Sequence, residues 1–272
     1  MTGISALPIG VFDSGVGGLT VLRALRAALP SEDFLYLGDT ARLPYGTKSA
    51  ATVARYAMQA AEALAARGIK CLVVACNTAS SVAIPALAVR LAPIPVIGVI
   101  EPGAAAAAQA TRSGRIAVIA TEGTVRGGAY PRSLAALAPH AVVTQKACPL
   151  FVALAEEGWT DGPIVEAVVR RYLEPVFSGD AAPDTLLLGC THFPALVAPI
   201  RRIVGQGVTI VDSAETTAAA TAAQLARLGL QRAAGIGAVR MMATDGPERF
   251  ARVGSVFSGE PIAASEVELV DL

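Results

Sequence analysis

Apolar segments of strand length alternate along the chain with longer stretches whose apolar residues recur at helical spacing. The pattern predicts strands at residues 9–12, 34–37, 71–75, 96–99, 115–119, 142–145, 185–188 and 208–211. Helices are predicted between them, among others at residues 18–28, 50–67, 126–138, 163–173, 214–228 and 247–253. Near-continuous apolar strands that alternate with helices are typical of parallel sheets covered on both faces. We therefore expect an α/β fold.

Two of the predicted strand ends resemble each other. Residues 72–78 read LVVACNT and residues 186–192 read LLLGCTH, so each strand ends at a cysteine followed by hydrogen-bonding side chains. Residues 9–14 and 116–121 also resemble each other, at a similar separation along the chain. The pattern predicts one unit used twice: two pseudo-symmetric domains, each a mostly parallel sheet flanked by helices. We place the first domain at residues 1–100 plus 212–272 and the second at residues 101–211.

Composition excludes several classes of protein. The 22 basic and 22 acidic residues cancel, so no global positive field favours nucleic acid. Residues 71–89 carry no charge, but Asn77, Thr78 and Pro85 among them argue against a membrane span. Gly10 and Asp13 interrupt the early apolar run, so no secretion signal is predicted. The four cysteines are too few for a secreted disulfide scaffold, and we expect reduced thiols in a cytoplasmic protein.

The loop after the first strand reads DSGVGGLT at residues 13–20 and opens a predicted helix. Its glycines, with Asp39 after the second strand, partly match a dinucleotide-binding fingerprint. Thr20 occupies the third glycine position, however, and Asp13 would lie beside the pyrophosphate. The exposed N–H groups of a helix start suit a small carboxylate better, with Asp13 available as an acid, a base or a partner for an amine.

Cysteine and histidine positions indicate acid/base chemistry. Cys76 and Cys190 lie where a strand ends and a helix is expected to begin, a setting that lowers the pKa of a thiol. Cys71 and Cys148 are expected to be buried structural residues. In parallel sheets ligands bind at the carboxyl ends of the strands, so the first two thiols can flank one bound molecule. No zinc-ligand spacing is present, and we predict no metal site.

The remaining titratable residues offer few alternatives. His192 follows Cys190 closely and is expected to assist it, whereas His140 is expected at the surface. Glu156 and Glu157 end an apolar helical stretch, where carboxylates are usually solvated. Only three lysines, Lys48, Lys70 and Lys146, are available for a pyridoxal phosphate Schiff base, which weakens that interpretation. The donor-rich loop at residues 38–48 is a candidate for ligand binding.

Five motifs in order resemble the glutamate racemases, a family within the cofactor-independent aspartate/glutamate racemase superfamily. They are GVFDSGVGGLTV at residues 10–21, PYG at 44–46, ACNTAS at 75–80, CPLF at 148–151 and GCTHFP at 189–194. The resemblance implies a site between two pseudo-symmetric domains and a reaction that uses no cofactor. It also implies interconversion of L- and D-glutamate, supply of D-glutamate for peptidoglycan, and a homodimer.

The resemblance assigns roles position by position. Cys76 and Cys190 would be the catalytic acid/base thiols, the first assisted by Asp13 and the second by His192 and Glu156, with Glu157 as the alternative glutamate. Substrate contacts would come from Asp13, Ser14, Pro44, Tyr45, Gly46, Cys76, Asn77, Thr78, Thr121, Cys190, Thr191 and His192. Three alternatives stay open: a racemase of aspartate or another small acidic amino acid, a nucleotide-dependent oxidoreductase and a non-catalytic binding protein.

Overall fold

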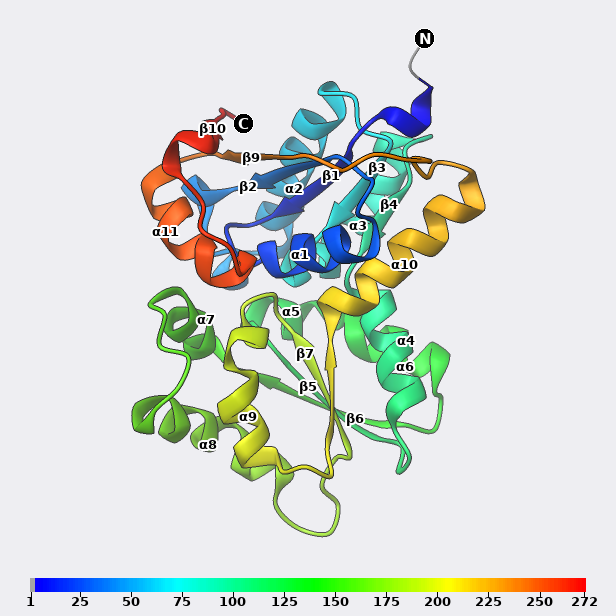
Figure 1. Ribbon diagram of the computed structural model, residues 1–272. Coiled ribbons are helices and arrows are strands. Elements are labelled where there is room, and N and C mark those ends of the chain that lie inside the picture. Colours follow the sequence, from blue (N-terminus) through cyan, green and yellow to red (C-terminus); the bar gives the residue numbers. More distant parts are fainter. Residues whose placement is uncertain (1–2) are drawn as a thin grey trace.

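Ten strands form two separate sheets in the computed structural model, which describes residues 3–272 (Figure 1). The upper sheet contains β1 Ile9–Asp13, β2 Phe34–Gly38, β3 Cys71–Val74, β4 Val96–Gly98, β9 Val239–Ala243 and β10 Val267–Leu269. The lower sheet contains β5 Arg115–Ala120, β6 Val142–Ala147, β7 Thr185–Gly189 and β8 Thr209–Asp212. Every strand pairing in the described part of the chain is parallel. The predicted α/β class is confirmed.

The two sheets repeat one strand order. The upper sheet runs β10-β9-β2-β1-β3-β4 and the lower sheet β6-β5-β7-β8, so β1 and β5 hold the same place in each. The predicted duplication is therefore visible in the topology. Strands β9 and β10 are additions to the upper sheet that the sequence pattern did not predict. β9 is interrupted by the exposed Arg240, and β10 has one buried residue followed by two exposed ones, so neither reads as a continuous apolar run.

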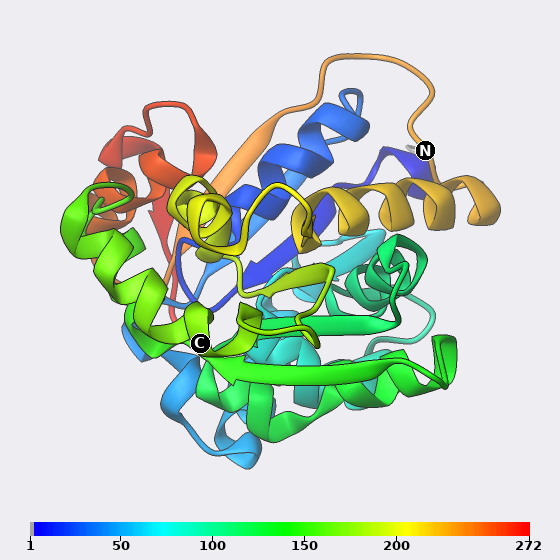
Figure 2. The same ribbon diagram turned by 90° about the horizontal axis from the view of Figure 1, so that it is seen from below.

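Helices cover both faces of each sheet, as the predicted class requires. The α-helices are α1 Leu19–Ala28, α2 Ala50–Ala66, α3 Asn77–Leu91, α4 Ile100–Ala110, α5 Glu122–Gly127, α6 Ala129–Leu137, α7 Pro149–Glu156, α8 Pro163–Phe177, α9 Val197–Val204, α10 Ser213–Leu228 and α11 Pro247–Ser258. We call each sheet with its helices a lobe. In the upper lobe, α1, α10 and α11 pack on one face of the sheet and α2 and α3 on the other. In the lower lobe, α7, α8 and α9 face α4 and α6 across the sheet (Figure 2).

One predicted helix is wrong. The stretch at residues 126–138 is not continuous, because α5 ends and α6 begins around Gly128, whose φ of 61° lies in the left-handed region. Glycine adopts that conformation without steric cost, so it permits a sharp change of helix direction that a periodicity count does not detect. Helix α11 is longer than predicted and extends to Ser258.

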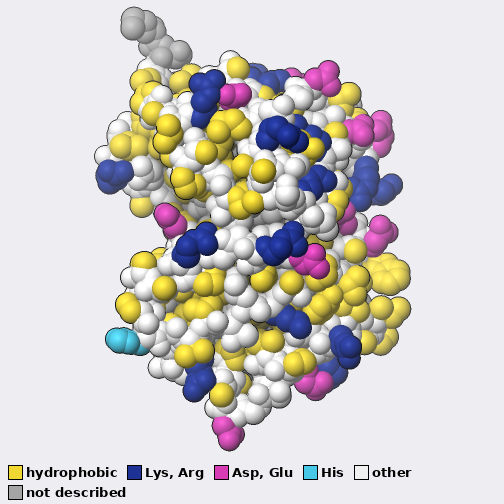
Figure 3. Space-filling view, turned by 180° about the vertical axis from the view of Figure 1, so that it is seen from behind, with side chains coloured by type: hydrophobic (Ala, Val, Ile, Leu, Met, Phe, Trp, Pro, Cys, Tyr) yellow, Lys and Arg dark blue, Asp and Glu magenta, His cyan; other side chains and the backbone are white. Residues whose placement is uncertain are grey.

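The chain passes between the lobes at α4 and α10, which pack against each other (Figure 1). The predicted boundaries at residues 100/101 and 211/212 fall at these two connections and stay a prediction. Within residues 3–272, no helix is long and apolar enough to cross a membrane. Charges of both signs are scattered over the face shown in Figure 3, as the balanced composition leads one to expect.

A buried ion pair lies at the amino ends of the upper strands, away from the edge where the strands end. Lys70, just before β3, bonds Glu32, just before β2, and both side chains are almost fully buried. Lys70 also donates to the carbonyl of Ser5 at 2.6 Å, and Glu32 accepts from the amide of Arg232 at 2.8 Å. The pair thus ties two distant segments, those of Ser5 and Arg232, to the sheet.

Removing one member of this pair should cost more stability than removing both. We expect Lys70→Met to lower the free energy of unfolding by about 3 kcal/mol, because it leaves the Glu32 carboxylate buried and unpaired. The double variant Glu32→Gln/Lys70→Met should recover part of that loss. Urea denaturation is measured for four proteins: the wild type, Glu32→Gln, Lys70→Met and the double variant. A double variant as unstable as the sum of the two single variants would contradict this account of the pair.

Candidate active site

A cavity of about 330 Å³ opens between the carboxyl ends of the strands of the two sheets. Both lobes contribute to its walls, which consist of Ser14, Gly15, Leu43, Pro44, Tyr45, Gly46, Thr47, Cys76, Asn77, Thr78, Thr121, Glu122, Pro149, Val152, Ala153, Glu156, Cys190, Thr191 and His192. The structure therefore brings together all the residues to which the racemase resemblance assigns a role, except Asp13 and the alternative glutamate Glu157. Asp13 lies fully buried directly behind this wall.

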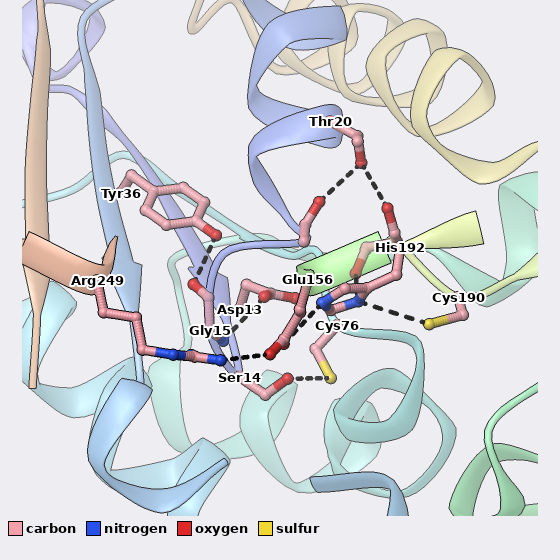
Figure 4. A network of polar contacts seen from close by, with 12 residues as sticks. Asp13, Ser14, Gly15, Thr20, Tyr36, Cys76, Glu156, Cys190, His192 and Arg249 are labelled. Atoms are coloured by element: carbon pink, nitrogen blue, oxygen red, sulfur yellow. Dashed lines mark hydrogen bonds and ion pairs between the residues drawn. The ribbon is translucent and has the colours of Figure 1, made fainter. Parts of the chain in front are cut away.

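Cys76 lies in the connection between β3 and α3 and is the N-cap residue of α3. Its Sγ lies 3.5 Å from the amide nitrogen of Ala79 and 3.4 Å from Ser14 Oγ (Figure 4). The expectation of a lowered pKa is wrong for this thiol. Burial, followed by the negative charge of Asp13, raises the pKa of Cys76 to about 12 and outweighs the two hydrogen bonds. Cys76 is therefore a neutral thiol at ordinary pH.

Asp13 is the last residue of β1 and has no exposed surface. Its Oδ2 accepts from the amide of Gly15 at 2.9 Å, while Oδ1 has no partner among the described residues. Burial raises the pKa of Asp13, although the charge of His192 and neighbouring backbone amides oppose the shift. A Cβ on Gly18 would lie 2.5 Å from Asp13 Cβ, so the loop closes this tightly only with glycine there. The charge of Asp13 acts on the neighbouring thiol of Cys76.

Cys190 has a different set of partners, joined in a chain. His192 Nδ1 lies 3.8 Å from Cys190 Sγ, and His192 Nε2 lies 3.1 Å from Glu156 Oε1. Glu156 Oε2 in turn accepts from Arg249 at 2.9 Å (Figure 4). Glu157, the alternative glutamate, is exposed at the end of α7. A series of hydrogen-bonded titratable groups thus leads to Cys190. No such series leads to Cys76 among the described residues.

The protonation of this chain follows from its contacts. Burial alone would lower the pKa of His192, but hydrogen bonds to Cys190 and Glu156 and their charges raise it to about 10. Burial would raise the pKa of Glu156, but His192 and Arg249 together lower it to about 2. The imidazolium therefore has both ring nitrogens available as donors, one to the carboxylate and one to the sulfur.

The loop after β1 packs directly on His192. A Cβ on Gly17 would lie 2.5 Å from the imidazole ring and from Thr191 Oγ1, so only glycine allows this approach. The hydroxyl of Thr20 donates to the carbonyl of Thr191 at 3.2 Å, which joins α1 to the opposite lobe. The loop after β1 in the upper lobe is thus in direct contact with the segment of the lower lobe that carries Cys190 and His192.

Asp39 does not occupy the place of a ribose ligand. It is fully buried, and its oxygens accept from Arg42, from the hydroxyl of Thr244 and from the hydroxyl of Tyr45. Its role in the structure is to hold the loop that presents Tyr45 and Gly46 to the cavity. The geometry therefore gives no support to the dinucleotide interpretation.

A chain of hydrogen bonds fixes the amide of Asn77. Ser213 Oγ donates to the carbonyl of Leu188 at 2.8 Å, so it must accept from Tyr130, whose hydroxyl lies 3.4 Å away. The Tyr130 oxygen then accepts from Asn77 Nδ2 at 2.8 Å. Asn77 Oδ1 remains as a buried acceptor without a partner in the described chain, on a residue that lines the cavity. An ammonium group is a suitable donor to it.

Three hydroxyl groups join the lobes on the other side of the cavity. Thr78 Oγ1 lies 2.9 Å from Thr121 Oγ1 and 3.2 Å from Thr124 Oγ1, and the last two lie 3.0 Å apart. The described walls contain no lysine or arginine. Carboxylates bound there would be held by hydroxyl, amide and backbone N–H donors rather than by a cation.

Sequence reasoning missed several residues of the site. Pro149, Val152 and Ala153 precede Glu156 at helical spacing and could have been found from it, because these positions share one face of α7. Arg249 could not have been found, because it lies far along the chain and meets Glu156 only through the tertiary fold. Among the described residues, no group of three or more His, Cys, Asp or Glu is arranged to hold a metal ion.

The pair of His192 and Glu156 should make stability depend on pH in a defined window. A raised folded pKa of His192 contributes stability that is complete below about 6.5 and lost as pH rises to about 10. Glu156→Gln removes the carboxylate that raises this pKa. We expect the variant to lose about 2 kcal/mol of unfolding free energy near neutral pH and less at alkaline pH. Urea denaturation across that range is the measurement.

The exposed neighbour supplies the control for this experiment. Glu157→Gln should follow the wild-type pH profile, because Glu157 makes no ion pair with His192. Identical profiles for Glu156→Gln and the wild type would show that the carboxylate does not hold the imidazolium.

Comparison with known proteins agrees with this geometry. Residues 9–221 match the Asp/Glu/Hydantoin racemase family. A glutamate racemase of Geobacter metallireducens is 52% identical over 253 residues, covering 92% of each chain. The crystal structure of glutamate racemase from Francisella tularensis subsp. tularensis in complex with D-glutamate has a TM-score of 0.91 at 36% identity, covering 98% of each chain. Glutamate racemase from Thermus thermophilus in complex with beta-chloro-D-alanine has a TM-score of 0.88 at 46% identity, again covering 98% of each chain. The chain belongs to the Asp/Glu/Hydantoin racemase family.

Proposed function

We propose that this protein interconverts L-glutamate and D-glutamate by proton transfer at the α-carbon, with Cys76 and Cys190 as the two bases. The observation that carries the proposal is that two thiols from equivalent strand ends line one small cavity. The relatives named glutamate racemase, and the D-glutamate complex of one of them, support the choice of substrate. Inversion needs a proton removed on one face and returned on the other, which two opposed groups can do without moving the substrate.

The two thiols have different partners. His192 Nδ1 lies 3.8 Å from Cys190 Sγ, and we assign to Cys190 the removal of the proton in one direction. Cys76 is protonated and delivers a proton to the opposite face of the α-carbon. For the reverse direction the roles exchange, and the buried Asp13 accepts or returns the Cys76 proton. Removal of the substrate proton and delivery of the new one leave the total number of protons unchanged.

The carbanion that forms between the two transfers needs stabilisation. Thr78, Thr121 and Thr191 place hydroxyl groups at the cavity, and α3 and α5 begin there with free N–H groups. Asn77 Oδ1 accepts from the substrate ammonium group. Tyr45, Gly46 and Ser14 contact the remainder of the substrate. These donors are fixed before the reaction, so they cost no reorganisation as charge develops.

The chemical step can be tested by isotope exchange and by replacing each thiol. In deuterium oxide, L-glutamate should racemise and gain deuterium at the α-carbon. Cys76→Ser and Cys190→Ser should each lower kcat by about a thousandfold or more, the order of effect of a lost acid or base catalyst. Cys71→Ala should retain activity, because Cys71 is buried at the amino end of β3.

Two outcomes would count against the proposal. Racemisation without deuterium incorporation would exclude proton exchange with the thiols. Faster racemisation of L-aspartate than of L-glutamate would favour the alternative substrate. The described cavity walls contain no lysine or arginine that would select one side-chain carboxylate position over the other. Polarimetry with each pure enantiomer measures both rates.

The biological setting forms the rest of the proposal. We place the protein in the cytoplasm as a supplier of D-glutamate for peptidoglycan, working without a cofactor. The two domains comprise residues 1–100 plus 212–272 and residues 101–211. We expect a homodimer, and sedimentation equilibrium should give twice the monomer mass of 27.6 kDa. A single species at the monomer mass over the whole concentration range would refute the dimer.

A further inference from the structure

Helix α11 belongs to the upper lobe but reaches the hydrogen-bonded chain of the lower lobe at two points. Arg249 bonds Glu156 Oε2, and the ring of Phe257 packs edge-on against the imidazole of His192, with ring centroids 5.0 Å apart. Figure 1 shows α11 directly above α7, which carries Glu156. The sequence motifs that carry the racemase resemblance include no part of α11.

Arg249 bonds the oxygen of the Glu156 carboxylate that His192 leaves free. One oxygen of Glu156 accepts from His192 and the other from Arg249. The Glu156 side chain is 14% exposed, whereas that of Arg249 is 44% exposed, so the guanidinium lies between solvent and the buried carboxylate. A charge-assisted bond to the second oxygen restricts rotation of the carboxylate and favours its ionised form.

The effect of this contact falls on one thiol. The chain from Arg249 through Glu156 and His192 ends at Cys190 (Figure 4). The partners of Cys76 are Ser14 and the amide of Ala79, and within residues 3–272 the hydrogen bond of Arg249 goes to Glu156 alone. A change at Arg249 therefore reaches the two proton transfers unequally.

We propose that Arg249 is a positioning residue for the Cys190 half of the site, and that it acts across the two lobes by holding Glu156 against His192. This inference rests on the proposed two-thiol racemisation. It assigns to the upper lobe a part in preparing a base that belongs to the lower lobe. The hydrogen-bonded chain at Cys190 then depends directly on contact between the lobes, whereas the hydrogen bonds of Cys76 to Ser14 and Ala79 stay within the upper lobe.

Isotope effects can separate the two transfers. Enantiomers have equal free energies, so any variant must change kcat/KM equally for L- and D-glutamate. Substrate carrying deuterium at the α-carbon slows only the step that removes it. If the transfer at Cys190 becomes slower, the isotope effect on kcat/KM should rise for the enantiomer that Cys190 deprotonates and fall for the other. A general loss of structure would not move the two values in opposite directions.

The first experiment measures these isotope effects in Arg249→Gln. We expect kcat/KM to fall about tenfold with both enantiomers, the order of one charge-assisted hydrogen bond, and the two isotope effects to diverge. Arg249→Lys keeps the charge and should recover part of the activity. Arg252→Gln is the matched control, because Arg252 is exposed on the same helix and bonds no described residue of the site. It should behave as the wild type.

A second experiment does not require racemisation. Iodoacetamide alkylates thiolates, and mass spectrometry of the peptides gives a separate rate for each cysteine. In Arg249→Gln, alkylation of Cys190 should slow several-fold while that of Cys76 is unchanged. Unaltered alkylation of Cys190, or equal slowing at both thiols, would overturn the role of Arg249. Failure of the wild-type protein to racemise glutamate would overturn the proposed function and leave the alkylation result to decide the role of Arg249.

Discussion

The common direction of the strands is the constraint on which the site depends. In a parallel sheet all carboxyl ends lie on one edge, and ligands bind where neighbouring connections leave in opposite directions. Here β1 and β3 end at Asp13 and next to Cys76, and β5 and β7 end next to Thr121 and Cys190. The same strand order occurs twice, and the two sheet edges face one cavity. The duplication itself therefore places two thiols, Cys76 and Cys190, in the wall of that cavity.

Burial then makes the two similar groups different. Both thiols are almost fully buried, and at Cys76 burial raises the pKa. Beside Cys76 stands another acid, Asp13, whose negative charge adds to this effect. Beside Cys190 stands an imidazolium that a carboxylate and a guanidinium hold in place. A repeated strand order therefore carries two thiols with different neighbours, a buried carboxyl beside Cys76 and an imidazole beside Cys190.

Strand periodicity is a local property, and it was sufficient to predict the fold class and the duplication. Most residues of the cavity wall were predicted only through the racemase resemblance. The sequence was insufficient where distant segments meet. The raised pKa of Cys76 depends on Asp13 and on burial, neither of which a helix-start argument contains. The break at Gly128 depends on one backbone angle. Arg249, on α11, contacts Glu156 only in the folded protein. Asp39 accepts hydrogen bonds from Tyr45 and Thr244, which a sequence fingerprint does not reveal.

Close contacts at three glycines limit the volume of the cavity. Gly17 leaves room for the imidazole of His192 on one side of the cavity, and on the other a Cβ on Gly46 would lie 2.8 Å from Thr121 Cβ. A Cβ on Gly123 would lie 2.9 Å from the carbonyl oxygen of Gly46. Glycine at these positions lets the lobes approach until the enclosed space is about 330 Å³, near the lower limit for ligand sites. That volume suits an amino acid and is too small for a dinucleotide, so Gly17, which resembles part of a nucleotide fingerprint in sequence, contributes in the fold to a cavity that excludes one.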